Sequence, residues 1–291
     1  VIEGRETEYF VVGRHAPAGG RKLGYVEWGD SANSRVAVCV HGLTRNCRDF
    51  DWLAASLAET HRVLAIDVAG RGRSEWPAMP AAYAPATYID DIRELLLHLG
   101  IAEVDWVGTS MGGIMGMLVA GSAAADERGL IRKLVLNDIG PFLASAPMTA
   151  LAARVGHAPS FADMGEAEAY QREVCSTWGA LPADHWARLA EHSVREVESG
   201  GYTYHHDPRI GDVVRERMPA PDLDLWSIWD RIECPVLITR GADSEILSAP
   251  TASEMTERGP GATLVEYPGI GHTPSLMVDD QIATVVDWIR G

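Results

Sequence analysis

One serine of the chain stands in a setting that can turn its hydroxyl into a nucleophile. Ser110 lies in Gly108-Thr-Ser-Met-Gly112, between a short apolar run at 104–107 and a longer one that extends to residue 120. Gly-x-Ser-x-Gly between a strand and a helix places the serine on a sharp, strained turn at a sheet edge. There the hydroxyl can attack a substrate carbonyl, while the N–H of Met111, at the start of the helix, points at the carbonyl oxygen.

A serine hydroxyl needs a base within hydrogen-bonding reach, and the leading candidate is His272. It lies in Tyr267-Pro-Gly-Ile-Gly-His-Thr-Pro274, directly after a strand pattern at 263–267. Glycines and prolines on both sides indicate a loop at a strand end that can hold the ring. The alternative is an ordinary exposed histidine, one of ten in the chain. His41 is a weaker candidate base, and we expect it to brace its own loop.

The acid that orients the imidazole is expected between nucleophile and base, in the order Ser, Asp, His. The leading candidate is Asp243, which follows the strand pattern at 235–239. Asp138 is a rival, because it also follows a strand pattern, at 133–136, and can reach the same imidazole from a neighbouring strand end. The other interpretation of Asp138 is a turn residue that accepts backbone N–H groups.

The oxyanion of such a reaction needs two N–H donors, and the loss of one costs about 2.7–4 kcal/mol of transition-state stabilisation. Met111 supplies the first. We expect the second from Leu43, in the turn His41-Gly-Leu-Thr44 that follows the apolar run at 36–40. Arg45, close to this turn, is a candidate ligand for a substrate carboxylate; the alternative is a solvated surface arginine.

These side chains must be positioned by alternating strands and helices. Continuous apolar runs, typical of strands buried on both faces, alternate with helical patterns at both ends of the chain. Strands are expected at 8–12, 23–27, 36–40, 62–66, 104–107, 133–136, 235–239 and 263–267, and helices at 49–58, 87–99, 249–258 and the C-terminus. The first two strands are expected to be an antiparallel pair. Repeated strand–helix units predict an α/β fold with a mostly parallel central sheet and helices on both faces.

The alternation stops between residues 139 and 230, where the pattern is helical, polar and rich in aromatic residues. We therefore expect a core formed by 1–138 and 231–291, and a helical insertion, 139–230, that acts as a lid over the site. Its aromatic residues can line an apolar substrate pocket or belong to the core. The candidates for substrate binding are Phe142, Trp178, Trp226 and Trp229.

Charge and composition exclude several classes of function. A net charge of −16 disfavours nucleic acid and anionic membrane surfaces as partners. The glycine-rich stretch 67–74 lacks the order of a nucleotide-binding loop, and His205-His206-Asp207 lacks a metal-binding framework, so we expect no metal and no cofactor. The four scattered cysteines, the lack of about 18 consecutive apolar residues and the lack of a secretory signal predict a cytoplasmic protein with reduced thiols. The oligomeric state is not indicated.

Taken together, His41-Gly42, the 67–74 stretch, Gly108–Gly113, Gly241-Ala-Asp243 and Gly271-His272 resemble the α/β-hydrolase superfamily. The order and spacing of these motifs match from about Tyr9 to Arg290, and the insertion resembles that family's helical cap. The Ser110 turn and Leu136-Asn-Asp-Ile-Gly-Pro141 are most similar to the branch of carboxylesterases, enol-lactonases and carbon–carbon bond hydrolases.

The resemblance implies a catalytic triad of Ser110, Asp243 and His272, with Leu43 and Met111 as oxyanion donors. A serine nucleophile argues against haloalkane dehalogenase and epoxide hydrolase chemistry, which use an aspartate at that place. The expected activity is hydrolysis of a small-molecule carboxylic ester or lactone through an acyl-enzyme. The alternatives are a hydrolase that cleaves a carbon–carbon bond beside a carbonyl, as in a vinylogous diketone, and a non-catalytic ligand receptor on the same scaffold.

Overall fold

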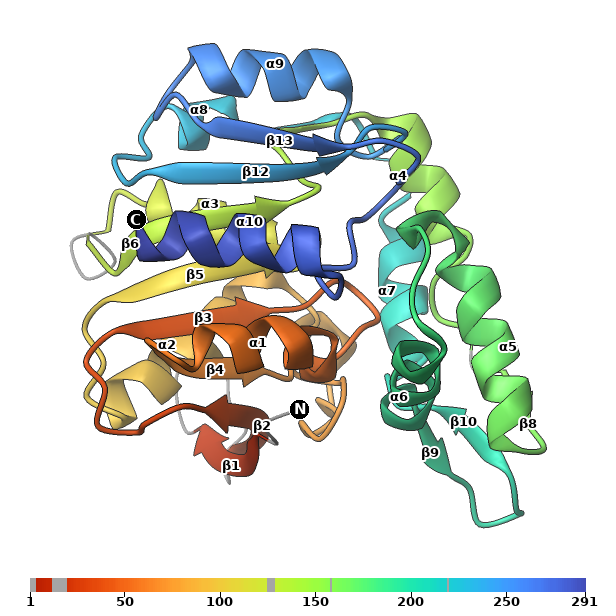
Figure 1. Ribbon diagram of the computed structural model, residues 1–291. Helices are drawn as coiled ribbons and strands as arrows, with labels where there is room; N and C mark the ends of the chain where they lie inside the picture. The colour runs from red at the N-terminus through yellow and green to blue at the C-terminus, as the bar shows by residue number, and fades with distance from the viewer. Residues whose placement is uncertain (1–3, 12–19, 125–128, 158, 219) are drawn as a thin grey trace.

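A single sheet of eight strands forms the centre of the computed structural model, which describes residues 4–11, 20–124, 129–157, 159–218 and 220–291 (Figure 1). The strand order is β1-β2-β4-β3-β5-β6-β12-β13. The strands are β1 Arg5–Val11, β2 Arg21–Trp28, β3 Val36–Val40, β4 Arg62–Ile66, β5 Val104–Thr109, β6 Ile131–Asn137, β12 Val236–Gly241 and β13 Thr263–Tyr267. Residue 12 of the first expected strand lies outside the described residues.

The direction of the strands confirms the expected sheet. Neighbours from β4 to β13 pair in parallel, while β1 with β2 and β2 with β4 pair antiparallel. In β3, Val36, Val38 and Val40 pack on one face of the sheet and Ala37 and Cys39 on the other. Both faces of this strand are therefore buried, which explains its uninterrupted apolar sequence.

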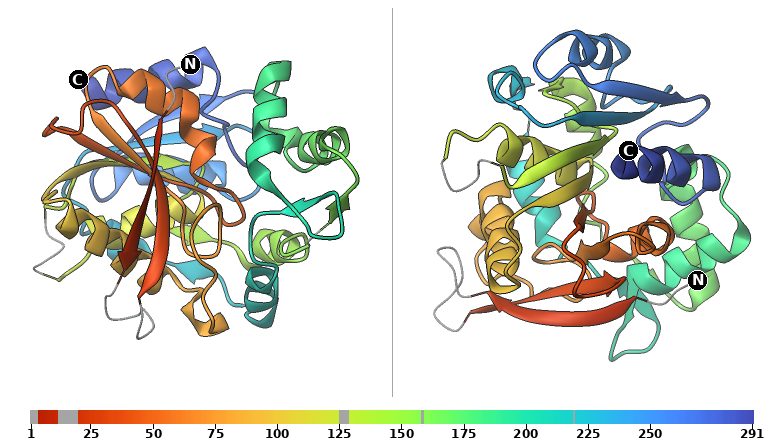
Figure 2. Two further views of the ribbon diagram at one scale, coloured as in Figure 1. Left: turned by 90° about the horizontal axis from the view of Figure 1, so that it is seen from below. Right: turned by 60° about the vertical axis from the view of Figure 1, so that its left-hand side comes forward.

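Helices cover both faces of the sheet. One face carries α1 (Asp51–Leu57), preceded by the short helix η1 (Cys47–Phe50), and α10 (Asp279–Arg290). The other face carries α2 (Pro85–His98), α3 (Met111–Ala120) and α9 (Ala249–Glu257). The right-hand view of Figure 2 shows α1 and α10 on one side of the sheet and α2 and α3 on the other.

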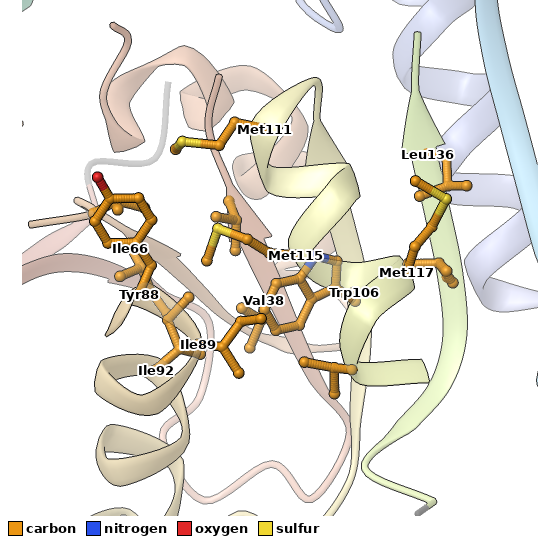
Figure 3. Close-up of a cluster of buried hydrophobic side chains, with 14 of the residues drawn as sticks. Val38, Ile66, Tyr88, Ile89, Ile92, Trp106, Met111, Met115, Met117 and Leu136 are labelled. Atoms are coloured by element: carbon orange, nitrogen blue, oxygen red, sulfur yellow. The ribbon is translucent and has the colours of Figure 1, made fainter. Parts of the chain in front are cut away.

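The core on the α2–α3 face fixes the helix that follows Ser110. Figure 3 shows Trp106 from β5 and Met115 from α3 packed together with side chains of α2. Trp106 is fully buried, and its indole N–H donates to the carbonyl oxygen of Gly112 at 3.0 Å. A buried indole with a satisfied N–H is well fixed, so the start of α3 is held against the sheet.

Most of the segment 139–230, here called the inserted segment, lies beyond the carboxyl ends of the parallel strands, whereas its last helix packs against α3 (Figure 1). Its helices are α4 Ser145–Ala152, α5 Met164–Val174, η3 Ser176–Trp178, α6 Ala183–Ser193, α7 Arg209–Glu216 and α8 Trp226–Trp229. It also contains short strands that the sequence did not reveal: β7 Phe142–Leu143, β8 Ser160–Phe161, β9 Val194–Glu196, β10 Tyr202–Tyr204 and β11 Leu223–Asp224. These form a three-stranded and a two-stranded sheet. The segment is therefore mixed in structure rather than helical throughout.

Two further expectations are answered by the same structure. The four cysteines, Cys39, Cys47, Cys175 and Cys234, are all free, and the first three are buried, as expected for reduced core residues. Among the described residues, no helix has both the length and the apolar character that crossing a bilayer requires.

Candidate active site

Ser110 lies on the sharp turn between β5 and α3, with the strained backbone that its sequence predicts. Its φ and ψ are 50° and −112°, in a region that residues with a Cβ rarely adopt. The glycines on either side permit the turn: a Cβ on Gly108 would lie 2.4 Å from the Gly112 backbone, and one on Gly112 would lie 2.0 Å from the carbonyl oxygen of Val40. This explains why the turn needs glycine at both positions.

His272 lies in a loop between β13 and α10 and reaches the serine. Its Nε2 is 3.0 Å from the Ser110 hydroxyl oxygen, and its Nδ1 is 2.7 Å from Oδ2 of Asp138. The imidazole is 19% exposed, whereas the Asp138 side chain is 0% exposed. A hydrogen-bonded chain therefore runs from a buried carboxylate through a partly exposed ring to the serine.

The structure brings Asp138, and not Asp243, to the imidazole. Asp138 directly follows β6, and its φ of 58° turns its side chain toward the end of the neighbouring β12. There Oδ1 accepts the N–H of Gly241 at 3.0 Å, and Oδ2 accepts the hydroxyl of Ser244 at 2.6 Å. Asp243 is exposed, and its backbone N–H donates to the carbonyl oxygen of Ile270. The prediction that Asp243 orients the base is therefore corrected in favour of its rival.

Two residues that sequence reasoning missed hold the His272 loop. Asn137 donates from Nδ2 to the carbonyl oxygen of Pro274 at 2.9 Å and accepts the Thr239 hydroxyl at its Oδ1. Thr177 of the inserted segment donates its hydroxyl to the carbonyl oxygen of His272 at 3.0 Å. The base is thus fixed from the sheet side and from the inserted segment. Asn137 precedes Asp138, so its place at a strand end was a signal in the sequence.

The loop after β3 borders the serine. A Cβ on Gly42 would lie 3.8 Å from the Cβ of Ser110. Met111 is the first residue of α3, so no carbonyl one turn earlier in the helix accepts its N–H. Within the described part of the chain, neither this N–H nor that of Leu43 donates to a protein acceptor. Both are free to bind an oxyanion.

His41 braces this loop. Its Nδ1–H donates to the carbonyl oxygen of Gly42 at 2.7 Å, and its Nε2 accepts the N–H of Val68 at 3.0 Å. Complete burial lowers its pKa to about 3, so the ring is neutral near pH 7. With both ring nitrogens engaged in this way, His41 is not available as a base.

The other side chains predicted to bind substrate are divided between two places. Arg45 and Trp178 lie near the serine, with the Arg45 guanidinium 5.2 Å from the Trp178 ring centre. Trp226 and Trp229 belong to α8, where Trp229 is fully buried and donates to the carbonyl oxygen of Arg258.

A built Cβ at Gly121 meets Ile228 of α8, and Gly121 caps the end of α3 that is farthest from Ser110. At 1.5 Å per residue, the ten residues of α3 separate α8 from Ser110 by about 15 Å. Trp229 is therefore a core residue and Trp226 a half-buried residue packed against the core, and the prediction that they bind substrate is corrected. Phe142 is half-buried in β7 and pairs with Asp224 of β11.

The glycine-rich stretch 67–74 is a structural turn. The Asp67 carboxylate accepts the N–H groups of Cys47 and Arg73, at 2.8 and 2.9 Å, and Ser74 accepts the N–H of Gly24. No cluster of three metal-ligating side chains occurs in the described ranges, His205-His206-Asp207 included.

The chain resembles known hydrolases over nearly its whole length. Residues 37–288 match the model of the alpha/beta hydrolase family. A 3-hydroxybutyrate-oligomer hydrolase of Cupriavidus necator is 38% identical over 283 residues, which are 95% of each chain. A 2-(acetamidomethylene)succinate hydrolase of Mesorhizobium japonicum is 28% identical over 80% of this chain and 79% of its own.

A solved structure agrees with these matches. An alpha/beta hydrolase from Novosphingobium aromaticivorans superposes with a TM-score of 0.85 at 31% identity, and the match covers 100% of this chain and 99% of the other. The strand order, the strained serine and the family match lead to one conclusion: the chain belongs to the alpha/beta hydrolase family and is a hydrolase.

Proposed function

We propose that this chain hydrolyses a carboxylic ester or lactone through an acyl-enzyme formed on Ser110. The observation that carries the proposal is the hydrogen-bonded chain from Ser110 through His272 to Asp138, with distances of 3.0 and 2.7 Å. Both distances lie within the range in which a proton can pass from a nucleophile to its base. Three groups in this order are the recurrent arrangement of serine hydrolases on unrelated folds.

The reaction follows from the geometry. The Ser110 oxygen attacks the ester carbonyl while its proton moves to Nε2 of His272, and the N–H groups of Leu43 and Met111 bind the oxyanion. The tetrahedral intermediate collapses, the carbon–oxygen bond to the alcohol breaks, and the alcohol leaves with the proton from Nε2. Water then attacks the acyl-enzyme and loses a proton to Nε2; the bond between the acyl carbon and the Ser110 oxygen breaks, Nε2 returns the proton to that oxygen, and the acid leaves.

Asp138 orients the base. Its Oδ2 accepts the proton on Nδ1 of His272, which leaves the lone pair of Nε2 directed at Ser110. The hydrogen bonds from Gly241 and Ser244 hold the carboxylate in the position where it makes this contact. Asp138 then stabilises the imidazolium that forms during each half of the reaction.

The substrate is a small molecule, and the inserted segment acts as a lid over it. The Cupriavidus necator relative named for 3-hydroxybutyrate oligomers makes short hydroxy-acid esters the first substrates to test. Trp178, buried beside Arg45, and Phe142 are the remaining aromatic candidates for contacts with the substrate. The cytoplasmic location remains a prediction.

A comparison of the purified wild type with Ser110→Ala tests the proposal. The wild type should cleave p-nitrophenyl butyrate and the dimer of 3-hydroxybutyrate, with a burst of p-nitrophenol that equals the enzyme concentration. Ser110→Ala should lose at least about 10⁴-fold in kcat. The control is Ser227→Ala, which removes an exposed serine on α8 and should retain wild-type activity. Full activity of Ser110→Ala would contradict the mechanism.

The same substrate panel decides between the proposal and its alternatives. A carbon–carbon bond hydrolase would turn over a vinylogous diketone faster than simple esters by several orders of magnitude. A receptor would bind a ligand tightly and show negligible turnover of both substrate types. Either result would replace ester hydrolysis as the function of this site.

A further inference from the structure

Two arginines lie beside the site, and they differ in whether a carboxylate neutralises them. A Cβ on Gly42 would lie 3.8 Å from both the Ser110 Cβ and the Arg45 Cγ, so Arg45 is next to the nucleophile. Its guanidinium is bound by both carboxylate oxygens of Asp49, at 2.8 and 2.5 Å. A two-point ion pair of this kind satisfies the charge of Arg45. Arg45 is therefore a poor ligand for an anionic substrate, contrary to the expectation from the sequence that it could bind a substrate carboxylate.

Arg71 is fully buried behind the same loop and pairs with no carboxylate among the described residues. Its Nε donates to the Leu43 carbonyl oxygen at 2.8 Å, and its Nη1 donates to the Ala69 carbonyl oxygen at 2.7 Å and the Tyr88 hydroxyl at 2.9 Å. Among the residues that the structure describes, its Nη2 has only the Met111 sulfur as an acceptor, at 3.8 Å. Because a thioether is a weak acceptor, Nη2 is free to bind a stronger one.

The positive charge of Arg71 is stabilised only in part by its surroundings. The Tyr83 and Tyr88 rings lie 5.7 and 5.1 Å from the Arg71 guanidinium carbon, close enough for cation–π attraction. Asp207, which accepts the Tyr83 hydroxyl, is itself paired with Arg209. A buried guanidinium without an acid costs free energy that a bound anion would offset.

Arg71 lines a cavity of about 130 Å³ that is also lined by Leu43 and Met111, the two proposed oxyanion donors. A second arginine, the exposed Arg217, also lines it. The remaining lining residues are apolar or aromatic, with no acid among them: Tyr83, Pro85, Tyr88, Ile210, Val213 and Val214. In a chain with a net charge of −16, this is a local site for an anion.

We propose that this cavity binds a carboxylate of the substrate and that Arg71 determines this specificity; the inference rests on ester hydrolysis at Ser110. A carboxylate oxygen replaces the Met111 sulfur at Nη2 and forms a charge-assisted hydrogen bond. The Tyr88 hydroxyl, whose hydrogen has no protein acceptor in the described part of the chain, donates to the same group. Figure 3 shows the Tyr88 hydroxyl and the Met111 side chain at the same end of the buried cluster.

The position of the cavity limits the substrate class. Because the residues of both oxyanion donors line this small cavity together with Arg71, the carboxylate must lie only a few atoms from the ester carbonyl. The substrate is then a short ester that also bears a free carboxylate, on either its acyl half or its alcohol half. Esters of both kinds present a carboxylate to Arg71. Substrates that carry it on one half or the other distinguish the two kinds.

The test compares each acidic ester with its own methyl ester, so that a general loss of activity cancels in the ratio. The dimer of 3-hydroxybutyrate carries the carboxylate on its alcohol half, and mono-p-nitrophenyl succinate carries it on its acyl half. In at least one pair, the wild-type kcat/KM should favour the acid by at least about tenfold. Arg71→Met should abolish this preference, and Arg71→Lys should retain part of it. The control Arg290→Met removes the same charge at the distant end of α10 and should preserve the ratio.

The outcomes separate this inference from the proposed function. Equal ratios for the wild type and Arg71→Met in both pairs would overturn the inference, while cleavage of the neutral esters would still support ester hydrolysis. If the wild type cleaves no ester, the proposed function fails.

A measurement on the wild type alone covers the case in which Arg71→Met does not fold. The 3-hydroxybutyrate anion should compete with p-nitrophenyl butyrate at least about tenfold more strongly than its methyl ester does. Equal inhibition by the two compounds would overturn the inference.

Discussion

Asp138 and His272 are 134 positions apart in the chain, yet Oδ2 of one lies 2.7 Å from Nδ1 of the other. The contact joins the end of β6 to the loop after β13, across the end of β12 that lies between these two strands in the sheet. The buried carboxylate also accepts the N–H of Gly241, the last residue of β12, and the hydroxyl of Ser244, which follows that strand. One side chain thus connects the ends of β6 and β12 to the loop that carries His272.

The first prediction concerns this contact. Asp138→Asn keeps the shape of the side chain but places an amide against Nδ1, which favours the imidazole tautomer with its proton on Nε2. The base is then blocked, and kcat for p-nitrophenyl butyrate should fall by about 10³- to 10⁴-fold. The matched control is Asp243→Asn, whose exposed side chain should matter by no more than about twofold. A larger loss in Asp243→Asn than in Asp138→Asn would restore Asp243 as the acid.

The sequence pointed to the serine and the histidine that the structure brings together, but it favoured Asp243 over the Asp138 that contacts the imidazole, for a physical reason. β6 and β12 are neighbours, so Asp138 and Asp243 follow adjacent strand ends. A sequence pattern gives the position of a strand end but not the direction of the side chain after it. Here the direction depends on the φ of 58° at Asp138, which no periodicity reveals.

The sheet could be predicted because its strands and the helices between them leave patterns in the sequence. A strand buried on both faces leaves a continuous apolar run, and the helices between such strands leave a regular stripe. Strands of two or three residues, such as β7 and β11, leave no pattern at all. In the same way, aromatic composition marked the inserted segment but did not separate Trp178 near the site from Trp229 in the core.

The second prediction concerns the hydrogen bond from Thr177 of the inserted segment to the backbone of His272. Thr177→Val removes the hydroxyl that donates to the His272 carbonyl oxygen. The loss of one hydrogen bond of about 1 kcal/mol should lower kcat about fivefold through poorer positioning of the ring, with KM unchanged. The control Thr149→Val removes an exposed hydroxyl on α4 that donates to Ser145. An equal effect of both variants in steady-state kinetics would rule out a positioning role for Thr177.

The third prediction concerns the glycine turn and is measured as stability. In Gly112→Ala, the new Cβ would meet the Val40 carbonyl oxygen at 2.0 Å, so the backbone of β3 or α3 must shift. The free energy of unfolding in urea should fall by about 3 kcal/mol or more. Gly100→Ala has no atom within 4 Å of its Cβ and bears only the penalty of its φ of 67°, about 1–2 kcal/mol. A loss in Gly112→Ala no larger than that in Gly100→Ala would show that the contact with Val40 does not make Gly112 necessary.

The last prediction concerns the pH dependence of stability and the buried His206. Burial, followed by the positive charges of Arg71 and Arg45, lowers its pKa from 6.5 to about 4. Between these pH values His206 is protonated in the unfolded chain but not in the folded chain. This histidine therefore lowers the free energy of unfolding as the pH falls below about 6.5. At pH 5 the cost is about 2 kcal/mol, since each pKa unit corresponds to about 1.4 kcal/mol.

His206→Phe removes this proton and keeps a ring against Tyr204, whose ring centre lies 5.3 Å away. Urea unfolding at pH 7.5 and pH 5 should therefore show a smaller loss of stability on acidification for His206→Phe than for the wild type, by about 2 kcal/mol. The comparison is a difference between two proteins, so the titration of all other groups cancels where the substitution leaves them unchanged. The same loss in both proteins would mean that His206 takes up its proton equally well in the folded and the unfolded chain.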